Sequence, residues 1–268
     1  QSGSNGPTNS FSFDINPTIP GATSDYNFNL ISDAPGNWSG SYSLDGTTYS
    51  GSQTISIANG TPTEITIDID PGASPAVSEY RLQMTLASNT NASLEQSVYV
   101  ISGITDLIVN GSGSNGSGTG NGAMDYEQDF LDGLNAAGNT ANTSTEANVM
   151  NILNDASALV DVNNIYLNIG WTFPSFTDED VASLSAFMDA GGNVFMAGQD
   201  IAWDVLSGDG YGTPATAAFM ENYMNAQYVA DGSTANNQLT AVATDVFFGG
   251  VANSSIVDVY SGNMYPDE

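Results

Sequence analysis

The residues best suited to chemistry are three aspartates that follow an expected strand-to-helix turn. Asp200, Asp204 and Asp209 come after a short apolar run, Val194–Met196, and after the turn Gly198-Gln199-Asp200. Open α/β sheets place ligands at the carboxyl ends of their strands. Carboxylates there can serve as general acid and base in glycoside hydrolysis, or as oxygen ligands for Ca²⁺. The alternative is structural: Asp200 caps the next helix, and Asp204 and Asp209 face water.

A second pair of carboxylates, Asp68 and Asp70, lies in the sequence IDIDPG. The two alternate with isoleucines, so they share one face of an expected strand that enters a turn. They can face water, or Asp70 can hold Ca²⁺ together with loop carbonyl groups. No segment has the spacing of an EF-hand loop. Apart from Ca²⁺, the sequence predicts no cofactor.

A glycine pattern typical of dinucleotide-binding loops occurs at Gly111, Gly113 and Gly116. It lies within a Gly/Ser/Asn tract, where such a match arises by chance. The next helix is expected several residues too late to direct its N-terminus at a phosphate, and no cationic residue is nearby. The pattern therefore predicts a loop rather than a nucleotide site.

Three aromatic residues, Trp171, Phe173 and Phe176, follow another expected strand. Aromatic rings at such a position can stack on sugars. The alternative is that they pack beneath the helix expected to begin after Thr177. Both interpretations remain open from the sequence.

The charge of the chain excludes several partners. The 268 residues include 30 acidic residues and one basic residue, Arg81, with no histidine, for a formal net charge of −29. Nucleic acids and anionic membranes bind through Lys and Arg, so neither is expected as a partner. No apolar run reaches the roughly 20 residues that span a bilayer. With no cysteine, the chain has neither disulfides nor thiol chemistry.

An extracellular location is expected. A chain with one Arg and no Lys offers a single site to trypsin-like proteases. The chain begins at Gln1, as a processed protein or a fragment of a longer one would. Acceptor motifs for N-glycosylation point the same way. They occur at Asn37, Asn59, Asn91, Asn110, Asn115, Asn142 and Asn253.

The elements that position these residues fall into two domains after a flexible leader over 1–10. From 11 to 102, about seven short strands alternate apolar and polar residues between turn signals, which is typical of an immunoglobulin-like or fibronectin-type β-sandwich. Trp38 is its expected core anchor. From 103 to 268, strands alternate with helices, which predicts an open α/β sheet. Because only Ser102 and Gly103 separate the two regions, we expect a restricted domain orientation.

The stretch Thr177–Asp204 carries the clearest pattern of the second domain. Thr177 precedes Asp178, Glu179 and Asp180, the residue types that favour a helix N-terminus. Apolar residues follow at helical spacing, and Gly191-Gly192 then ends the helix before the strand. Further helices are expected near 124–137, 145–159 and 213–225. Further strands are expected at 104–109, 165–169, 227–229, 239–242, 246–248 and 256–260.

This order of elements, ending in Gly-Gln-Asp-Ile-Ala-Trp at 198–203, resembles a known family. The family is the class I glutamine-amidotransferase-like, flavodoxin-like domains of large secreted surface proteins of Bacteroidota. In those proteins the domain often follows an immunoglobulin-like one, and export uses the type IX system. The resemblance covers most of 11–268, is most specific over Thr177–Trp203, and implies that the α/β domain is incomplete at its C-terminal end.

The resemblance implies a degenerate enzyme. Active relatives place a cysteine on this turn and use a histidine with a carboxylate, whereas this chain has neither cysteine nor histidine. We therefore expect a non-catalytic extracellular protein with a structural or adhesive role in a cell-surface or filamentous assembly. Its expected partners are other copies of itself, neighbouring domains of that assembly, and glycans. The alternatives are a hydrolase or accessory module for polysaccharide or peptide acting through Asp200 and Asp204, and a Ca²⁺-dependent recognition module.

Overall fold

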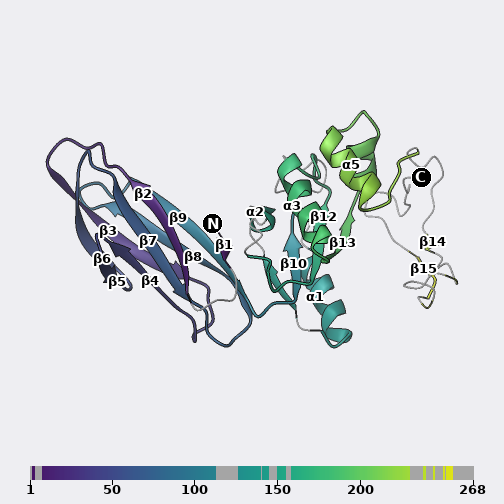
Figure 1. Ribbon diagram of the computed structural model, residues 1–268, viewed down its shortest axis with the longest axis horizontal. Coiled ribbons are helices and arrows are strands. Elements are labelled where there is room, and N and C mark those ends of the chain that lie inside the picture. The colour runs from purple at the N-terminus through teal and green to yellow at the C-terminus, as the bar shows by residue number, and fades with distance from the viewer. Residues whose placement is uncertain are drawn as a thin grey trace.

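The structure is a computed structural model that describes residues 2–3, 8–112, 126–139, 141–144, 150–154, 158–229, 238–239, 244, 250 and 252–255. These residues form a β-sandwich followed by a parallel sheet with helices (Figure 1). The predicted β-sandwich is confirmed, and the parallel sheet with helices lies in the region for which an α/β sheet was predicted. Within the described ranges, no helix is long and apolar enough to cross a membrane.

The sandwich consists of two sheets. The larger has the strand order β1 (Ser2–Gly3), β9 (Ser93–Ser102), β8 (Ala76–Leu86), β3 (Thr23–Ser32) and β6 (Gln53–Ala58). The smaller has the order β2 (Asn9–Ile15), β7 (Thr63–Asp70), β4 (Ser39–Leu44) and β5 (Thr47–Tyr49). The period-two alternation directs one face of each sheet inward.

The core lies between these sheets and is largely aliphatic and aromatic. Ile67 of β7 is fully buried, and the rings of Phe28 and Tyr42 stack with centroids 5.6 Å apart. Trp38 is buried as predicted, and its indole nitrogen donates a hydrogen bond to the carbonyl of Ser74 at 3.0 Å. This bond compensates for removing the Trp38 N–H from water.

One correction concerns the expected flexible leader over 1–10. Ser2–Gly3 forms β1, which pairs in parallel with Tyr99 and Val100 of β9, and β2 already begins at Asn9. Composition alone predicted flexibility. The backbone groups of the β9 edge offer hydrogen-bond partners that are independent of side chains, and Ser2–Gly3 pairs with them.

The outer faces of the sandwich carry rows of hydrogen-bonded polar side chains. In each row the partners lie directly opposite each other on neighbouring strands. On β3 and β6 the pairs are Asn27 with Thr54 at 2.7 Å and Asp25 with Ser56, and Ser52, just before β6, donates to Asn29 of β3 at 2.7 Å. On β2 and β7 they are Ser12 with Thr66 at 2.9 Å, and Ser10 with Asp68.

The second domain has a four-stranded sheet in which all neighbours are parallel. Its order is β11 (Ala141–Ser144), β10 (Asp106–Asn110), β12 (Asn164–Gly170) and β13 (Asn193–Gly198). The helices are α1 (Glu127–Ala136), α2 (Met150–Leu153), α3 (Asp178–Asp189), α4 (Ile201–Leu206) and α5 (Pro214–Asn222). A short pair, β14 (Gln238–Leu239) and β15 (Ser254–Ser255), follows.

Helices cover both faces of this sheet. Phe130 of α1 lies against Tyr166 and Phe195 of the sheet, with ring centroids 6.4 and 6.0 Å away. The other face packs with α2, α3 and α5 into one apolar cluster that includes Leu167, Leu184 and other buried residues. Helices therefore lie on both faces of the sheet, but β13 is less well covered than β10 and β12, and Phe195 on it remains 45% exposed.

Helix α3 follows the sequence pattern closely. The Thr177 hydroxyl accepts a hydrogen bond from the Asp180 N–H, and the Asp180 carboxylate accepts one from the Thr177 N–H, which is a capping box. Val181, Leu184 and Phe187 are buried. The helix ends where predicted.

Other expectations for this domain need correction. Residues 141–144, which were expected to precede a helix over 145–159, form β11 beside β10. Among the described residues of that expected helix, only Met150–Leu153 is helical. Gln227–Val229 is not a strand. The expected strands at 246–248 and 256–260 lie outside the described residues.

The junction between the domains is packed rather than loose. Ile101 of β9 belongs to the α/β core, and Val77 and Tyr99 pack against it from the sandwich. Gly103 has φ +66°, and a β-carbon there would press on Pro75, so the turn favours glycine. These contacts agree with the restricted orientation that the short connection predicts.

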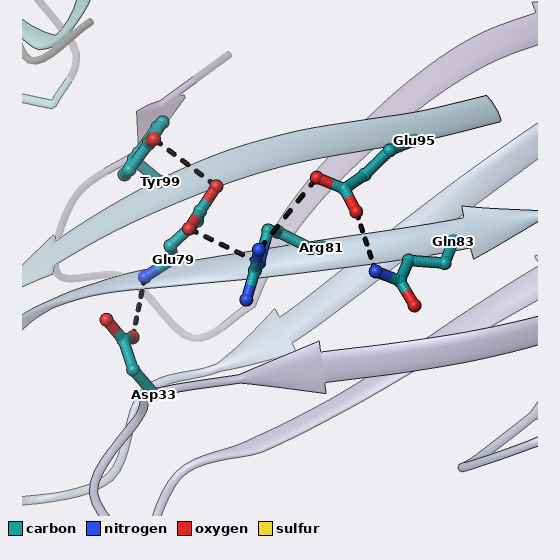
Figure 2. Close-up of polar contacts among 6 residues, drawn as sticks. All are labelled: Asp33, Glu79, Arg81, Gln83, Glu95 and Tyr99. Atoms are coloured by element: carbon teal, nitrogen blue, oxygen red, sulfur yellow. Dashed lines mark hydrogen bonds and ion pairs between the residues drawn. The ribbon is translucent and has the colours of Figure 1, made fainter. Parts of the chain in front are cut away.

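A polar network extends from this junction along β8 and β9 (Figure 2). Arg81 lies 3.5 Å from the Glu79 carboxylate and 4.0 Å from that of Glu95, which also accepts a hydrogen bond from Gln83 at 2.7 Å. The Tyr99 hydroxyl donates to Glu79 at 3.3 Å. The single basic residue of the chain is therefore placed beside the nearly buried Glu79.

Candidate functional site

The carboxyl ends of β10 and β12 are joined by side-chain amides. Asn168 donates from its amide nitrogen to the side-chain oxygen of Asn110 at 3.0 Å, and that oxygen also accepts the Ser112 N–H at 3.1 Å. The Asn168 side-chain oxygen accepts the Gly170 N–H at 3.1 Å. The two amides accept the backbone N–H groups of Ser112 and Gly170 where the strands diverge. This part of the edge therefore has a structural role.

The turn after β13 places Asp200 in an unusual backbone conformation. Its φ and ψ are 58° and 23°, the left-handed region, which Asp tolerates better than most residues. It occupies the N-cap position of α4, yet its side chain makes no capping hydrogen bond. The expected role of Asp200 as a side-chain cap is therefore wrong, because the left-handed turn replaces the extended geometry that such caps use.

Asp204 is buried, and it joins two loops. Its side chain accepts the backbone N–H of Ser175 at 2.7 Å through one oxygen and that of Tyr211 at 3.1 Å through the other. Asp204 is only 1% exposed, so the expectation that it faces water is wrong. A buried carboxylate needs such donors, and the loop between β12 and α3 and the loop after α4 each provide one.

The remaining candidate carboxylates do not join this group. Asp209 is exposed, and its N–H donates to the Ser207 hydroxyl at 3.1 Å. On the sandwich, Asp68 accepts the Ser10 hydroxyl and Asp70 is exposed. Within the described part of the chain, no three carboxylates come together in a way that could hold a metal ion.

The glycine pattern after β10 is described only in part. The Gly111 N–H donates to the Asn168 carbonyl at 2.7 Å, which ties this glycine to the sheet. Gly113 and Gly116 lie outside the described residues. A hydrogen-bonded Gly111 agrees with the structural interpretation of this segment.

An aromatic cluster lies at the same edge of the sheet. Phe173 is at its centre, with ring centroids 6.4 Å from Trp171, 5.4 Å from Trp203 and 6.5 Å from Tyr211. Trp171, Phe173 and Trp203 are partly buried, whereas Tyr211 is 61% exposed. We call these four residues the aromatic platform.

Phe176 is not part of the platform. It is buried against Phe219 of α5, with centroids 5.9 Å apart, so for Phe176 the packing alternative is correct. Sequence reasoning missed Trp203 and Tyr211. The signal was available, because both follow β13, the neighbour of β12, and the carboxyl ends of parallel strands meet at one edge.

The loop that carries Tyr211 lies directly on α4. A β-carbon at Gly210 would strike the Asp204 backbone, and one at Gly212 would strike the Val205 backbone. The Gly212 N–H donates to the Asp204 carbonyl at 2.9 Å. Only glycine fits at these two positions, so the loop has a fixed path on both sides of Tyr211.

A groove with a volume of about 440 Å³ opens between α4 and α5. Its wall includes Leu206, Thr213, Pro214 and Tyr228, together with one carboxylate, Glu221. Among the described residues that line the groove, Glu221 is the single carboxylate, so this part of the lining lacks the pair of groups that acid–base hydrolysis uses.

The opposite edge of the sheet holds another buried acid, Asp106. It accepts hydrogen bonds from Thr105 at 2.9 Å and Asn164 at 2.8 Å, and from the Tyr166 hydroxyl at 3.5 Å. Burial, together with the negative charge of Asp106, raises the pKa of Tyr166 above its ordinary value. Tyr166 therefore stays protonated as a donor to Asp106.

The glycosylation motifs fall into distinct environments. Asn37, Asn91 and Asn253 are exposed. The Asn59 amide nitrogen donates to the Gly21 carbonyl at 3.2 Å, and the Asn110 side-chain oxygen accepts a hydrogen bond from Asn168 at 3.0 Å, so both side chains make contacts within the fold. Only the backbone of Asn142 is described, and Asn115 lies outside the described residues.

Comparison with known proteins gives no family. No protein-family model matches the chain, and no curated protein matches its sequence. The chain is similar to the solved N-terminal domain of PorA at 6% identity and TM-score 0.27, over 36% of this chain and 78% of that one. It is similar to WR4, an MSP family member of C. elegans, at 15% identity and TM-score 0.23, over 38% and 91%.

A third solved structure is a family 123 glycoside hydrolase from Clostridium perfringens. The identity is 9% and the TM-score 0.24, over 63% of this chain and 34% of that one. Scores this low carry no information about what this chain does.

Proposed function

We propose that this chain is a non-catalytic extracellular protein with an adhesive role in a cell-surface or filamentous assembly. One observation carries the proposal. At the sheet edge where such folds place ligands, the buried acid Asp204 is committed to two backbone N–H groups, while the aromatic platform reaches the surface. The carboxylate at this edge already has its hydrogen-bond partners within the protein, whereas aromatic rings are exposed to solvent. Such a surface favours binding a ligand over catalysing a reaction.

The finer family assignment supports the same role. Counted along the chain from β10, the sheet strands lie in the order 2-1-3-4, which flavodoxin-like sheets share. We infer a flavodoxin-like, amidotransferase-like domain after an immunoglobulin-like one. Because the sequence has no cysteine and no histidine, amidotransferase catalysis is excluded.

The packed junction supports a role under mechanical restraint. Ile101, Val77 and Tyr99 join the two cores, so the domains present their surfaces in a fixed relation. A rigid pair of domains loses less conformational entropy when it binds than a flexible pair does. Such rigidity suits a part of a stalk or filament.

The test is adhesion of the purified chain to bacterial cells, extracellular matrix and neutral polysaccharides, combined with sedimentation analysis. We expect binding to at least one surface, or self-assembly. A strictly monomeric chain that binds none of them would contradict the proposal. In parallel, hydrolysis of polysaccharides and peptides is measured for the native chain and for Asp200→Asn and Asp204→Asn.

The parallel assay separates adhesion from the hydrolase alternative. We expect no turnover. Turnover that both substitutions abolish would establish the hydrolase instead. A melting temperature that falls in EDTA would support the Ca²⁺-dependent alternative, although its predicted ligands Asp68, Asp70, Asp200, Asp204 and Asp209 form no three-carboxylate cluster within the described residues.

A further inference from the structure

We propose that the aromatic platform is a binding site for uncharged polysaccharide, in which Tyr211 and the rings behind it stack on a pyranose. The inference deepens the proposed adhesive role and rests on it. The platform is made by Trp171, Phe173, Trp203 and Tyr211. The argument uses ring geometry, the way the rings are held, and charge.

The ring geometry is suited to a flat apolar ligand surface. Tyr211 and Phe173 stack with an interplanar angle of 21°, while Trp171 stands at 87° to Phe173. Tyr211 therefore lies beside a ring of similar orientation, with the two centroids 6.5 Å apart, while 61% of Tyr211 remains exposed. The C–H face of a pyranose is apolar, and it packs on such a ring as another aromatic group would.

The platform is held before any ligand arrives. Asp204 binds the N–H of Ser175, two residues after Phe173, and also the N–H of Tyr211 itself. Gly210 and Gly212 fix the backbone on both sides of Tyr211 against α4. Because the rings are already ordered, binding costs little conformational entropy. This small cost matters because each contact with a sugar is weak. Asp204 is thus a positioning residue.

Charge selects the class of sugar. The chain carries 30 acidic residues and its one basic residue, Arg81, lies in the sandwich on β8. No Lys or Arg is available to pair with a uronate or sulfate at the platform, and the net negative charge repels both. The hydroxyl groups of an uncharged sugar remain suitable partners, because carboxylates can accept hydrogen bonds from them and amides can both accept and donate. The exposed side chains of Gln199 and Asp209 lie on the segments that carry Trp203 and Tyr211.

Affinity electrophoresis through laminarin, xyloglucan and galactomannan, followed by calorimetry, tests the site, with alginate as the anionic probe. We expect retardation in at least one neutral polymer and none in alginate. Tyr211→Ala should weaken binding about tenfold, which corresponds to about 1.4 kcal/mol. Tyr211→Phe should bind within about threefold of the native chain, because the ring is kept. Tyr126→Ala, which removes an exposed tyrosine at the N-cap of α1, should bind as the native chain does.

Several outcomes would overturn the proposal. They are binding of no neutral polymer, equal binding by the native chain and Tyr211→Ala, or binding of alginate. Self-association that Tyr211→Ala abolishes would assign the platform to a second copy instead. Melting temperatures of all variants confirm that the fold is intact.

The result is separable from that for the proposed function. If cells or matrix are bound equally well by Tyr211→Ala, the adhesive role stands and the sugar site fails. If no variant binds any surface or polymer and the native chain does not self-assemble, both fail.

Discussion

The outer faces of the sandwich and the C-terminal edge of the parallel sheet treat polar groups in opposite ways. On the sandwich, Asn27 pairs with Thr54 and Asp25 with Ser56, so the side chains satisfy one another across strands. At the sheet edge, Asp204 and Asn168 bind backbone groups, and the exposed surface is left to aromatic rings. On the sandwich, the polar side chains therefore bind one another. At the sheet edge, they hold the loops that carry the exposed aromatic surface in place.

The difference shows how a chain with almost no cations can use carboxylates. One basic residue cannot neutralise 30 acidic ones. An exposed carboxylate can be hydrated while it accepts a hydrogen bond from a neighbouring hydroxyl, as Asp25 does from Ser56. A buried one needs N–H donors, and the bonds it makes to Ser175 and Tyr211 bring two loops together.

The largest change in the free energy of unfolding is expected for a substitution in the sandwich core. The same variant tests whether the two regions unfold as one unit. Ile67→Ala should lower the free energy of unfolding by about 3 to 4 kcal/mol, since Ile67 is fully buried. In a Trp38→Phe background, fluorescence reports only Trp171 and Trp203. Because the junction is packed, this signal should shift together with far-UV circular dichroism. Separate transitions would mean that the regions are independent; Thr48→Ala on β5 is the exposed control.

The second prediction concerns the acid at the sheet edge. Asp204→Asn should lower the free energy of unfolding by about 2 to 3 kcal/mol, because an amide NH₂ then faces a backbone N–H. Asp209→Asn, at an exposed position, should change it by less than about 0.5 kcal/mol. Urea unfolding measures both. Equal effects would show that Asp204 has no special role, and the contrast with the sandwich surface would disappear.

The third prediction concerns the polar rows. Asn27→Ala removes one member of the β3–β6 row and should cost about 0.5 to 1 kcal/mol. The double-mutant cycle with Thr54→Ala should give a coupling energy of similar size, because the two side chains are bonded to each other. A coupling energy of zero would show that the row does not stabilise the fold, because water would then be as good a hydrogen-bond partner for each side chain.

The smallest change in the free energy of unfolding at neutral pH is expected for Tyr42→Phe. The Tyr42 hydroxyl donates a long hydrogen bond, 3.3 Å, to the Gly51 carbonyl. Burial, followed by the charge of Tyr49, raises the pKa of Tyr42 from 10.0 to about 12. The folded state therefore holds this proton more tightly than the unfolded state does. The associated stability is complete below pH 10 and is lost as the pH rises towards 12.

Urea unfolding at pH 8, 10 and 11 measures this dependence. Tyr42→Phe should lose less stability than the native chain between pH 10 and 11. Tyr211→Phe, which removes an exposed hydroxyl, is the matched control and should follow the native chain. Identical slopes for all three proteins would contradict the role assigned to burial.

Sequence patterns were sufficient where local signals agreed with packing. The alternation in Thr63–Asp70 and the capping residues of Thr177–Asp180 predicted β7 and the start of α3, since each pattern buries one face. Patterns failed where the partner was a backbone group. β1 and β11 contain polar or small residues, and only the edges of β9 and β10 make them strands.

The same limit applied to the site. The position of the site at the strand ends was predictable from topology alone. The burial of Asp204 was not, because its donors lie far away in sequence, at Ser175, or on a loop whose path depends on Gly210 and Gly212. Trp203 and Tyr211 required the pairing of β12 with β13 to be known.

The parallel pairing of β1 with β9 has a mechanical consequence. Tension applied between residues before β1 and the α/β domain pulls these two strands past each other along their length. The hydrogen bonds of Ser2–Gly3 with Tyr99 and Val100 lie across that direction, so they are loaded in shear and must break together. An antiparallel hairpin pulled from its open end would instead unzip one bond at a time. β1 therefore resists such tension until both of these pairings break.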